Sequence, residues 1–196
     1  MVLVQNLSYT ISSHDYLKYN NQSKNKIKYY DFQWIDLTQQ VRDIRKAFGQ
    51  FSSSKTQVCN TLKPVEIEFD AQEDVLEATQ SVDFDKGDVI IKKSGIYLVI
   101  AGPQIAKLRG ARNRWIDFWL RVNNVDLPNS NVRRVLTDSQ EKDVIPINAV
   151  CPLNRCDTLN IMMAAETEGE GIGIEALQPD GEPTIPSVIL TLVQLD

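Results

Sequence analysis

Short runs of apolar residues, separated by Gly, Pro, Asn or Asp, recur roughly every 10–15 residues through the last two-thirds of the chain. Many of their side chains are β-branched or aromatic, as is typical of strands, and no stripe with a helical period follows residue 61. The runs lie at 65–69, 88–105, 115–130, 143–153, 157–165, 171–177 and 186–195. This spacing predicts a mainly β domain over residues 61–196, an antiparallel sandwich or barrel of about eight to ten strands.

A different pattern precedes these runs, between residues 31 and 51. Large apolar residues recur there in alternating steps of three and four, which predicts an amphipathic helix. They are Trp34, Leu37, Val41, Ile44, Phe48 and Phe51. Two interpretations stay open, because the stripe can pack on the chain's own domain or pair with the same stripe of identical chains as a short coiled coil.

The segment 52–60, SSSKTQVCN, separates the predicted helix from the strand runs. A serine-rich composition of this kind is typical of a hinge, so the domain boundary is predicted here. Residues 1–55 are then expected to form an N-terminal arm and the amphipathic helix, and residues 61–196 the β domain.

Charge is distributed unevenly along a chain whose formal net charge is −5. Residues 1–60 carry eight Lys and Arg against four acidic residues, whereas the remainder carries 13 against 22. An acidic main domain argues against nucleic acid as a partner. No apolar run has the roughly 18 residues of a membrane span, and no secretory signal opens the chain. Assembly in the cytoplasm is therefore expected, with a particle such as a virion as one destination.

Residues for covalent or metal chemistry are scarce, since the chain has one histidine, His14, and three cysteines. His14 lies in the polar N-terminal arm, remote in the sequence from every cysteine, so no Cys–His pair for nucleophilic catalysis is indicated. We therefore expect a protein that is not an enzyme and needs no cofactor. Cys151 and Cys156 lie five apart across a predicted turn, where they remain reduced thiols or form a disulfide.

Two loops carry candidate binding residues. The first puts Arg109, Arg112 and Arg114 before Trp115, and arginine and tryptophan are enriched where proteins bind partners. The second concentrates carboxylates, and Glu166, Glu168 and Glu170 are candidate Ca²⁺ ligands because Ca²⁺ prefers oxygen ligands. A solvated acidic loop is the alternative for the second, and a rim loop paired with nearby acids is the alternative for the first.

Several motifs occur in one order along the β part: SGIYLVIAGPQI (94–105), WLRVNN (119–124), NSNVRR (129–134), NAVCPLNRCDTLNIMM (148–163) and IPSVILTLVQL (185–195). Together they resemble the trimeric jelly-roll head shared by complement component 1q and tumour necrosis factor, and more narrowly its bacterial and viral members. The sequence departs from the family at Cys156, where a turn glycine is expected, and at Asn123–Asn124, where the family has Asn-Gly.

This resemblance implies an antiparallel jelly-roll sandwich that assembles as a homotrimer, with Tyr97, Trp119 and Leu195 as candidate interface residues. The stripe of Trp34, Leu37, Val41, Ile44 and Phe48 would then form a three-chain stalk. The implied function is a non-enzymatic recognition module that binds a protein or a glycan through its rim loops. The alternative is a structural component of a virus or phage particle (capsid, decoration or tail-fibre head) or of a spore surface.

Overall fold

The computed structural model describes residues 46–72, 82–85, 88–110, 112–139 and 141–196. Within these ranges every regular element is a β-strand, and no helix has the length and hydrophobicity that crossing a bilayer requires. The strands are β1 (Phe48–Ser53), β2 (Gln57–Val58), β3 (Val65–Glu66), β4 (Ala71–Gln72), β5 (Val82–Asp85), β6 (Asp88–Ile91), β7 (Gly95–Lys107), β8 (Arg114–Val122), β9 (Val125–Asp126), β10 (Val132–Leu136), β11 (Lys142–Val144), β12 (Ile147–Leu153), β13 (Thr158–Ala165), β14 (Ile172–Ile174) and β15 (Val188–Gln194).

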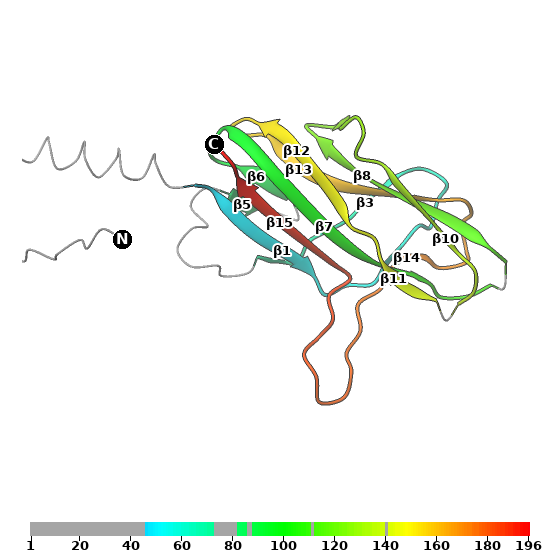
Figure 1. Cartoon of the computed structure of the whole chain (residues 1–196). Helices are drawn as coiled ribbons and strands as arrows, with labels where there is room; N and C mark the ends of the chain where they lie inside the picture. The colour runs from blue at the N-terminus through cyan, green and yellow to red at the C-terminus, as the bar shows by residue number, and fades with distance from the viewer. Residues whose placement is uncertain (1–45, 73–81, 86–87, 111, 140) are drawn as a thin grey trace, which may run out of the picture. The chain divides into compact units, whose positions relative to one another are not determined.

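The first of two antiparallel sheets has eight strands and is built around the 13-residue strand β7. One edge of β7 pairs with β12 and then β11, and the other edge pairs with β15 and then β14. Strand β1 covers the outer edge of β15, and β4 pairs with β1. Figure 1 shows β12, β7, β15 and β1 side by side, although they come from distant parts of the chain.

The second sheet has seven strands in the order β10-β8-β13-β6-β5, with β3 paired to β13 and β9 to β8. The chain passes from one sheet to the other between β6 and β7, β7 and β8, and β12 and β13. Antiparallel strands that alternate between two sheets in this way form a jelly-roll sandwich. The predicted fold class is therefore confirmed.

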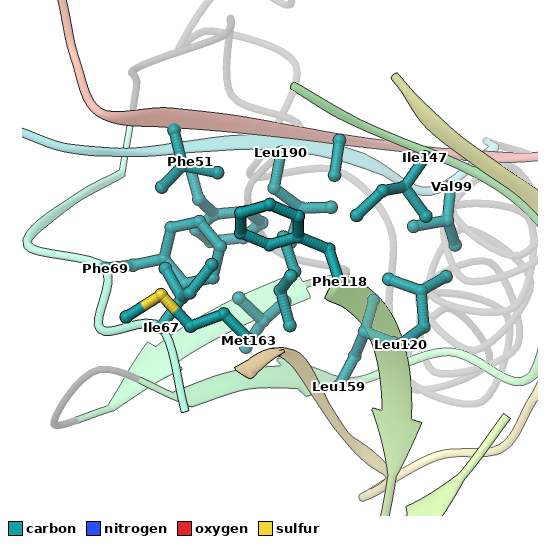
Figure 2. Packing of buried hydrophobic residues seen from close by; sticks show 14 of the residues in the cluster. Phe51, Ile67, Phe69, Val99, Phe118, Leu120, Ile147, Leu159, Met163 and Leu190 are labelled. Carbon is teal, nitrogen blue, oxygen red and sulfur yellow. The ribbon is translucent and has the colours of Figure 1, made fainter. Parts of the chain in front are cut away.

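The core lies between the two sheets and is formed by the inward positions of their strands. Figure 2 shows residues from both sheets meeting there: Phe51, Val99, Ile147 and Leu190 from the first, and Phe118, Leu120, Leu159 and Met163 from the second. These side chains are at most 1% exposed. Each contributes roughly 1.5–3 kcal/mol by leaving water, and this burial holds the sheets together.

The predicted helix is wrong at its C-terminal end, because Phe48–Ser53 form strand β1 and pair with β15 over their whole length. Phe51 is buried in the core, whereas Phe48, three residues earlier, is half-buried on the opposite face of the strand. The spacing of three residues between Phe48 and Phe51 therefore matched the predicted helical pattern by coincidence. The rest of the predicted helix, residues 31–45, lies outside the described residues.

The predicted hinge at 52–60 belongs to the sandwich. The carbonyl oxygen of Ser53 accepts a 2.8 Å hydrogen bond from the amide of Ser187, and the amide of Cys59 donates one of 2.8 Å to Ile172. Both Ser53 and Cys59 are buried. The compact unit begins at Lys46 rather than at residue 61.

Candidate functional site

The outward face of the first sheet carries large apolar side chains that no other residue described by the structure covers. On β7, Tyr97 and Val99 point into the core, so Ile96 and Ile100 point outward and are 43% and 42% exposed. On β12, Val150 is 63% exposed for the same reason. We call this surface the apolar face, and its apolar members on β1, β7, β12 and β15 are Phe48, Ile96, Leu98, Ile100, Val150, Ile189, Val193 and the adjoining Leu195.

Strand register aligns these side chains into a continuous row. Val150 of β12 lies opposite Leu98 of β7, Leu98 lies opposite Val193 of β15, and Val193 lies opposite Phe48 of β1. Paired positions on adjacent strands are close enough for their side chains to touch. Four neighbouring strands therefore present one uninterrupted apolar band.

The apolar face carries no charged residue at the outward positions of β1, β7, β12 and β15, all of which the structure describes. The outward face of the second sheet is different. There Asp117 pairs with Arg133, and Arg121 pairs with Asp126. Because charges resist dehydration and apolar groups favour it, the first sheet presents the face that is suited to burial against another surface.

The structure separates the predicted interface residues into three groups. Leu195 and Phe48 lie on the apolar face, where Leu195 is 49% exposed. Tyr97 does not, because its side chain is fully buried and its hydroxyl donates a 2.7 Å hydrogen bond to the carbonyl of Lys93. Burial raises the pKa of Tyr97 to about 12.

Trp119 does not lie on the apolar face either, since it lies on β8 in the second sheet. Its indole Nε1 donates a 2.7 Å hydrogen bond to Asp126 Oδ1. The same carboxylate accepts a hydrogen bond from Arg121, and these two bonds lower the pKa of Asp126. The remaining predicted interface residues, Trp34, Leu37, Val41 and Ile44, lie outside the described residues.

A second sequence pattern, runs of consecutive apolar residues rather than alternating apolar and polar ones, indicates the apolar face. The run Ile96–Ala101 and the run Val188–Val193 are apolar, or nearly so, at consecutive positions. A strand with one solvated face alternates between apolar and polar residues, whereas a strand that is covered on both faces does not. These two runs therefore indicated that the first sheet carries apolar residues on both of its faces.

A second surface is the rim at the end of the sandwich where β7, β8, β11 and β14 meet (Figure 1). Its central support is Lys107, the last residue of β7, whose side chain is fully buried. Its ammonium donates hydrogen bonds of 2.6 Å to the carbonyl of Arg112 and 3.4 Å to the carbonyl of Thr137. One buried cation thus holds the loop after β7 to the loop after β10.

The four predicted ligand-binding residues occupy this rim but differ in availability. Arg114 is committed within the protein, because its NH2 group lies 2.8 Å from Glu170 Oε1. Trp115 is half-buried, with the guanidinium of Arg133 stacked 4.1 Å from its ring centre. Arg109 and Arg112 are exposed and form no ion pair in the part of the chain that the structure describes. These two are the rim cations that remain available to a partner.

The carboxylates of the acidic loop do not lie together at one site. Glu170 pairs with Arg114, Glu166 Oε2 accepts a 3.2 Å hydrogen bond from the amide of Trp115, and Glu168 is exposed. Within the described ranges no three His, Cys, Asp or Glu side chains are grouped to hold a metal ion. Ca²⁺ binding by this loop stays a prediction.

The three cysteines are free thiols. Cys59 and Cys151 are buried, and burial raises the pKa of both, to about 11 for Cys59. Cys156 is exposed in the turn between β12 and β13. Cys156 has a φ of +73°, a left-handed conformation that favours glycine. The resemblance predicts glycine at this turn, and the backbone conformation is one that glycine adopts without strain.

The turn at Asn123–Asn124 also has a left-handed backbone conformation. It joins β8 to β9, and its two residues have φ values of +49° and +64°. Two consecutive left-handed residues form the tight hairpin turn for which asparagine and glycine are preferred. The asparagine pair thus forms this turn without the glycine that the resemblance led us to expect.

The chain is, by its own topology, an antiparallel jelly-roll sandwich with one apolar sheet face and a rim of charged loops. No protein-family model matches it, and no curated protein matches it in sequence. Among solved structures it is similar to murine APRIL, crystallised at pH 5.0, with 13% identity and a TM-score of 0.49 over 77% of this chain and all of that one. The predicted likeness to bacterial or viral members stays a prediction.

Proposed function

We propose that the protein is a homotrimeric recognition module without enzymatic activity, which assembles through the apolar face and binds a protein or a glycan through its rim loops. The observation that carries this proposal is the uncharged row of Phe48, Leu98, Val150 and Val193 across four strands. The described part of a single subunit does not cover this row. Association of copies about a common axis removes it from water in every copy at once.

The start of the sandwich supports a stalk next to this face. The amide of Ala47 donates a 2.9 Å hydrogen bond to Gln194 Oε1, and the ammonium of Lys46 donates one of 3.0 Å to the carbonyl of Leu195. The sandwich thus begins, at Lys46 and Ala47, beside the C-terminal end of the apolar face. In the trimer, the heptad positions Trp34 to Ile44 of three chains would start close together, as a coiled coil requires.

We assign ligand recognition to the rim because hydrogen bonds from a buried side chain support its loops. Lys107 holds the loop that carries Arg109 and Arg112, so these guanidinium groups are presented on a supported backbone. A trimer presents three such rims, and three weak contacts on one rigid body act together through their effective concentration. Arginine side chains without internal carboxylates favour a ligand with anionic groups.

Assembly is tested by the mass of the full chain in solution, measured by light scattering or sedimentation. The wild-type protein is expected at three chains, and Ile100→Asp at one chain with its β circular dichroism retained. Val135→Asp is the matched control, because Val135 is 46% exposed but lies on the second sheet. A wild-type monomer at micromolar concentration, or trimers with both variants, would contradict the proposal.

Ligand binding is tested on glycan and protein arrays with the assembled wild-type protein. A ligand of the rim is expected to lose binding at least tenfold with the double change Arg109→Glu and Arg112→Glu. Arg155→Glu is the control, since Arg155 is exposed in the turn between β12 and β13, away from the rim. If the double variant and Arg155→Glu bind the ligand equally well, the ligand binds outside the rim.

The second candidate function is a structural role in a virus or phage particle or on a spore surface. The same apolar face favours it, because a face that pairs copies in a trimer also suits subunits of a shell. The protein would then be recovered with purified particles and seen there by immunogold labelling. Recovery only in the soluble fraction of cells that produce particles would contradict this role.

A further inference from the structure

On the outward face of the second sheet, two carboxyl groups from different strands meet at one amide. Asn160 of β13 donates a hydrogen bond from its Nδ2 to Glu66 of β3 and another, of 3.1 Å, to Asp88 Oδ1 of β6. Asn160 is 5% exposed. We propose that Glu66 and Asp88 share one proton in the folded protein and form a pH-sensitive link between β3, β6 and the central strand β13.

The position of Glu66 explains why one proton is retained. Its carboxyl is partly withdrawn from water, lies against the negative charge of Asp88 and shares a hydrogen bond with that carboxyl. Burial raises the pKa of Glu66 most. Charge repulsion from Asp88 raises it further, and this hydrogen bond makes the next largest contribution. Two carboxylates this close cannot both ionise without repulsion, whereas one shared proton turns the repulsion into a hydrogen bond.

Other groups around the pair moderate this effect without removing it. Arg121 of β8, opposite Asn160 in the register, lowers the pKa of Glu66, as does the hydrogen bond from Asn160. Arg121 is already engaged, because its Nε donates a 2.7 Å hydrogen bond to Asp126 of β9. Among the side chains that the structure describes, Arg121 is the cation that acts on Glu66, and its charge is largely committed to Asp126.

The link matters because Glu66 lies where the chain crosses onto the second sheet. Strand β3 contacts β13 through two register pairs, Glu66 with Met162 and Val65 with Met163, and the amide of Ile67 donates a 2.8 Å hydrogen bond to Ile161. Loss of the shared proton places two negative charges at this short attachment. The deeply buried Ile67 keeps the segment in place, so we expect a loss of stability and faster local opening rather than release.

The direction of the pH dependence follows from the raised pKa. Below the ordinary carboxyl pKa of 4.5, Glu66 is protonated in both the folded and the unfolded chain. Above that value the unfolded chain loses the proton first, while the folded chain keeps it. The folding equilibrium constant therefore falls by up to about tenfold per pH unit across this window, and the loss is complete above the pKa of the folded state.

The experiment is chemical denaturation of the full chain at pH values from 4 to 8, with a chelator present to exclude metal effects. Glu66→Gln mimics the protonated carboxyl, and Glu68→Gln is the matched control. Glu68 is two residues away, is exposed, and lies 3.9 Å from the Lys55 ammonium rather than beside Asp88. Relative to the control, Glu66→Gln is expected to be more stable at pH 7, equal near pH 4, and free of the fall in between.

Asp88→Asn supplies the second variant, because it removes the repulsion from the other side. It should reproduce the gain at pH 7, and the double variant should gain little more, since both changes relieve one contact. Hydrogen exchange at the amide of Ile67, corrected for its intrinsic pH dependence, should slow in each variant at pH 7. If Glu66→Gln and Glu68→Gln show the same pH profile, or if both single variants lose stability at every pH, the shared proton is ruled out.

Discussion

The fully buried ammonium of Lys107 donates a 2.6 Å hydrogen bond to the carbonyl oxygen of Arg112, which belongs to the rim loop that follows it in the chain. A second hydrogen bond, of 3.4 Å, reaches the carbonyl of Thr137 in a different loop. A single side chain at the end of β7 thus connects the core to two loops of the rim. The geometry of the candidate binding surface depends on this connection.

Replacement of this lysine should destabilise the sandwich. Lys107→Met keeps the length of the side chain but leaves the carbonyls of Arg112 and Thr137 without their donor. Hydrogen bonds of a charged group contribute about 1.5–3 kcal/mol, so the free energy of unfolding should fall by about that amount. Urea denaturation measures the change. Lys63→Met, at an exposed position, is the control and should stay within about 0.5 kcal/mol of wild type.

The left-handed turn at Cys156 predicts a stabilising substitution. With φ at +73°, the side chain of Cys156 strains the backbone, and glycine removes this strain. Cys156→Gly should raise the free energy of unfolding by about 1 kcal/mol, measured by thermal or urea unfolding in the presence of a reductant. Cys156→Ala keeps the Cβ and loses only the thiol, so it should not gain. Equal gains in both variants would assign the effect to the thiol.

Close contact between β14 and β2 predicts the opposite result at Gly173. A Cβ at Gly173 would lie 2.0 Å from the carbonyl oxygen of Gln57 and 2.7 Å from the Cα of Val58. Both are backbone atoms, so Gly173→Ala must separate the two strands. We expect a loss of about 2 kcal/mol or more, measured by urea denaturation. At Gly102 the nearest contact of an added Cβ would be 3.4 Å, so Gly102→Ala should be tolerated in the same assay.

The accessibility of the three thiols predicts that only one of them reacts with a thiol reagent in the native protein. Cys59 and Cys151 are buried, and burial raises their pKa values, so neither provides a thiolate at pH 8. Cys156 is exposed and should be modified by a water-soluble disulfide reagent in the native protein. Mass spectrometry should find one label before denaturation and three after it. Two labels on the native protein, or a Cys151–Cys156 disulfide, would contradict the free-thiol arrangement.

The fold class was accessible from the sequence because strand formation leaves a local pattern. The runs at 88–105 and 186–195 cover β6, β15 and all but the last two residues of β7, and the asparagine pair at 123–124 forms a tight turn. Strand β1 was missed because Gly49 and the preceding Ala47, which face the core, are small and give no apolar alternation. The large residues that remain, Phe48 and Phe51, fall three apart and continue a helical stripe.

The sequence by itself determined that many short strands must pack as a sandwich, and that β7 and β15 carry apolar residues on both faces. It did not determine which side of each strand is inward, because Tyr97 and Leu98 are adjacent and both apolar. Tertiary structure decided this by placing Tyr97 in the core and Leu98 in line with Val150 and Val193. The pairing of Glu66 with Asp88 also appeared only in three dimensions, since contacts between distant strands depend on sheet register rather than on local sequence.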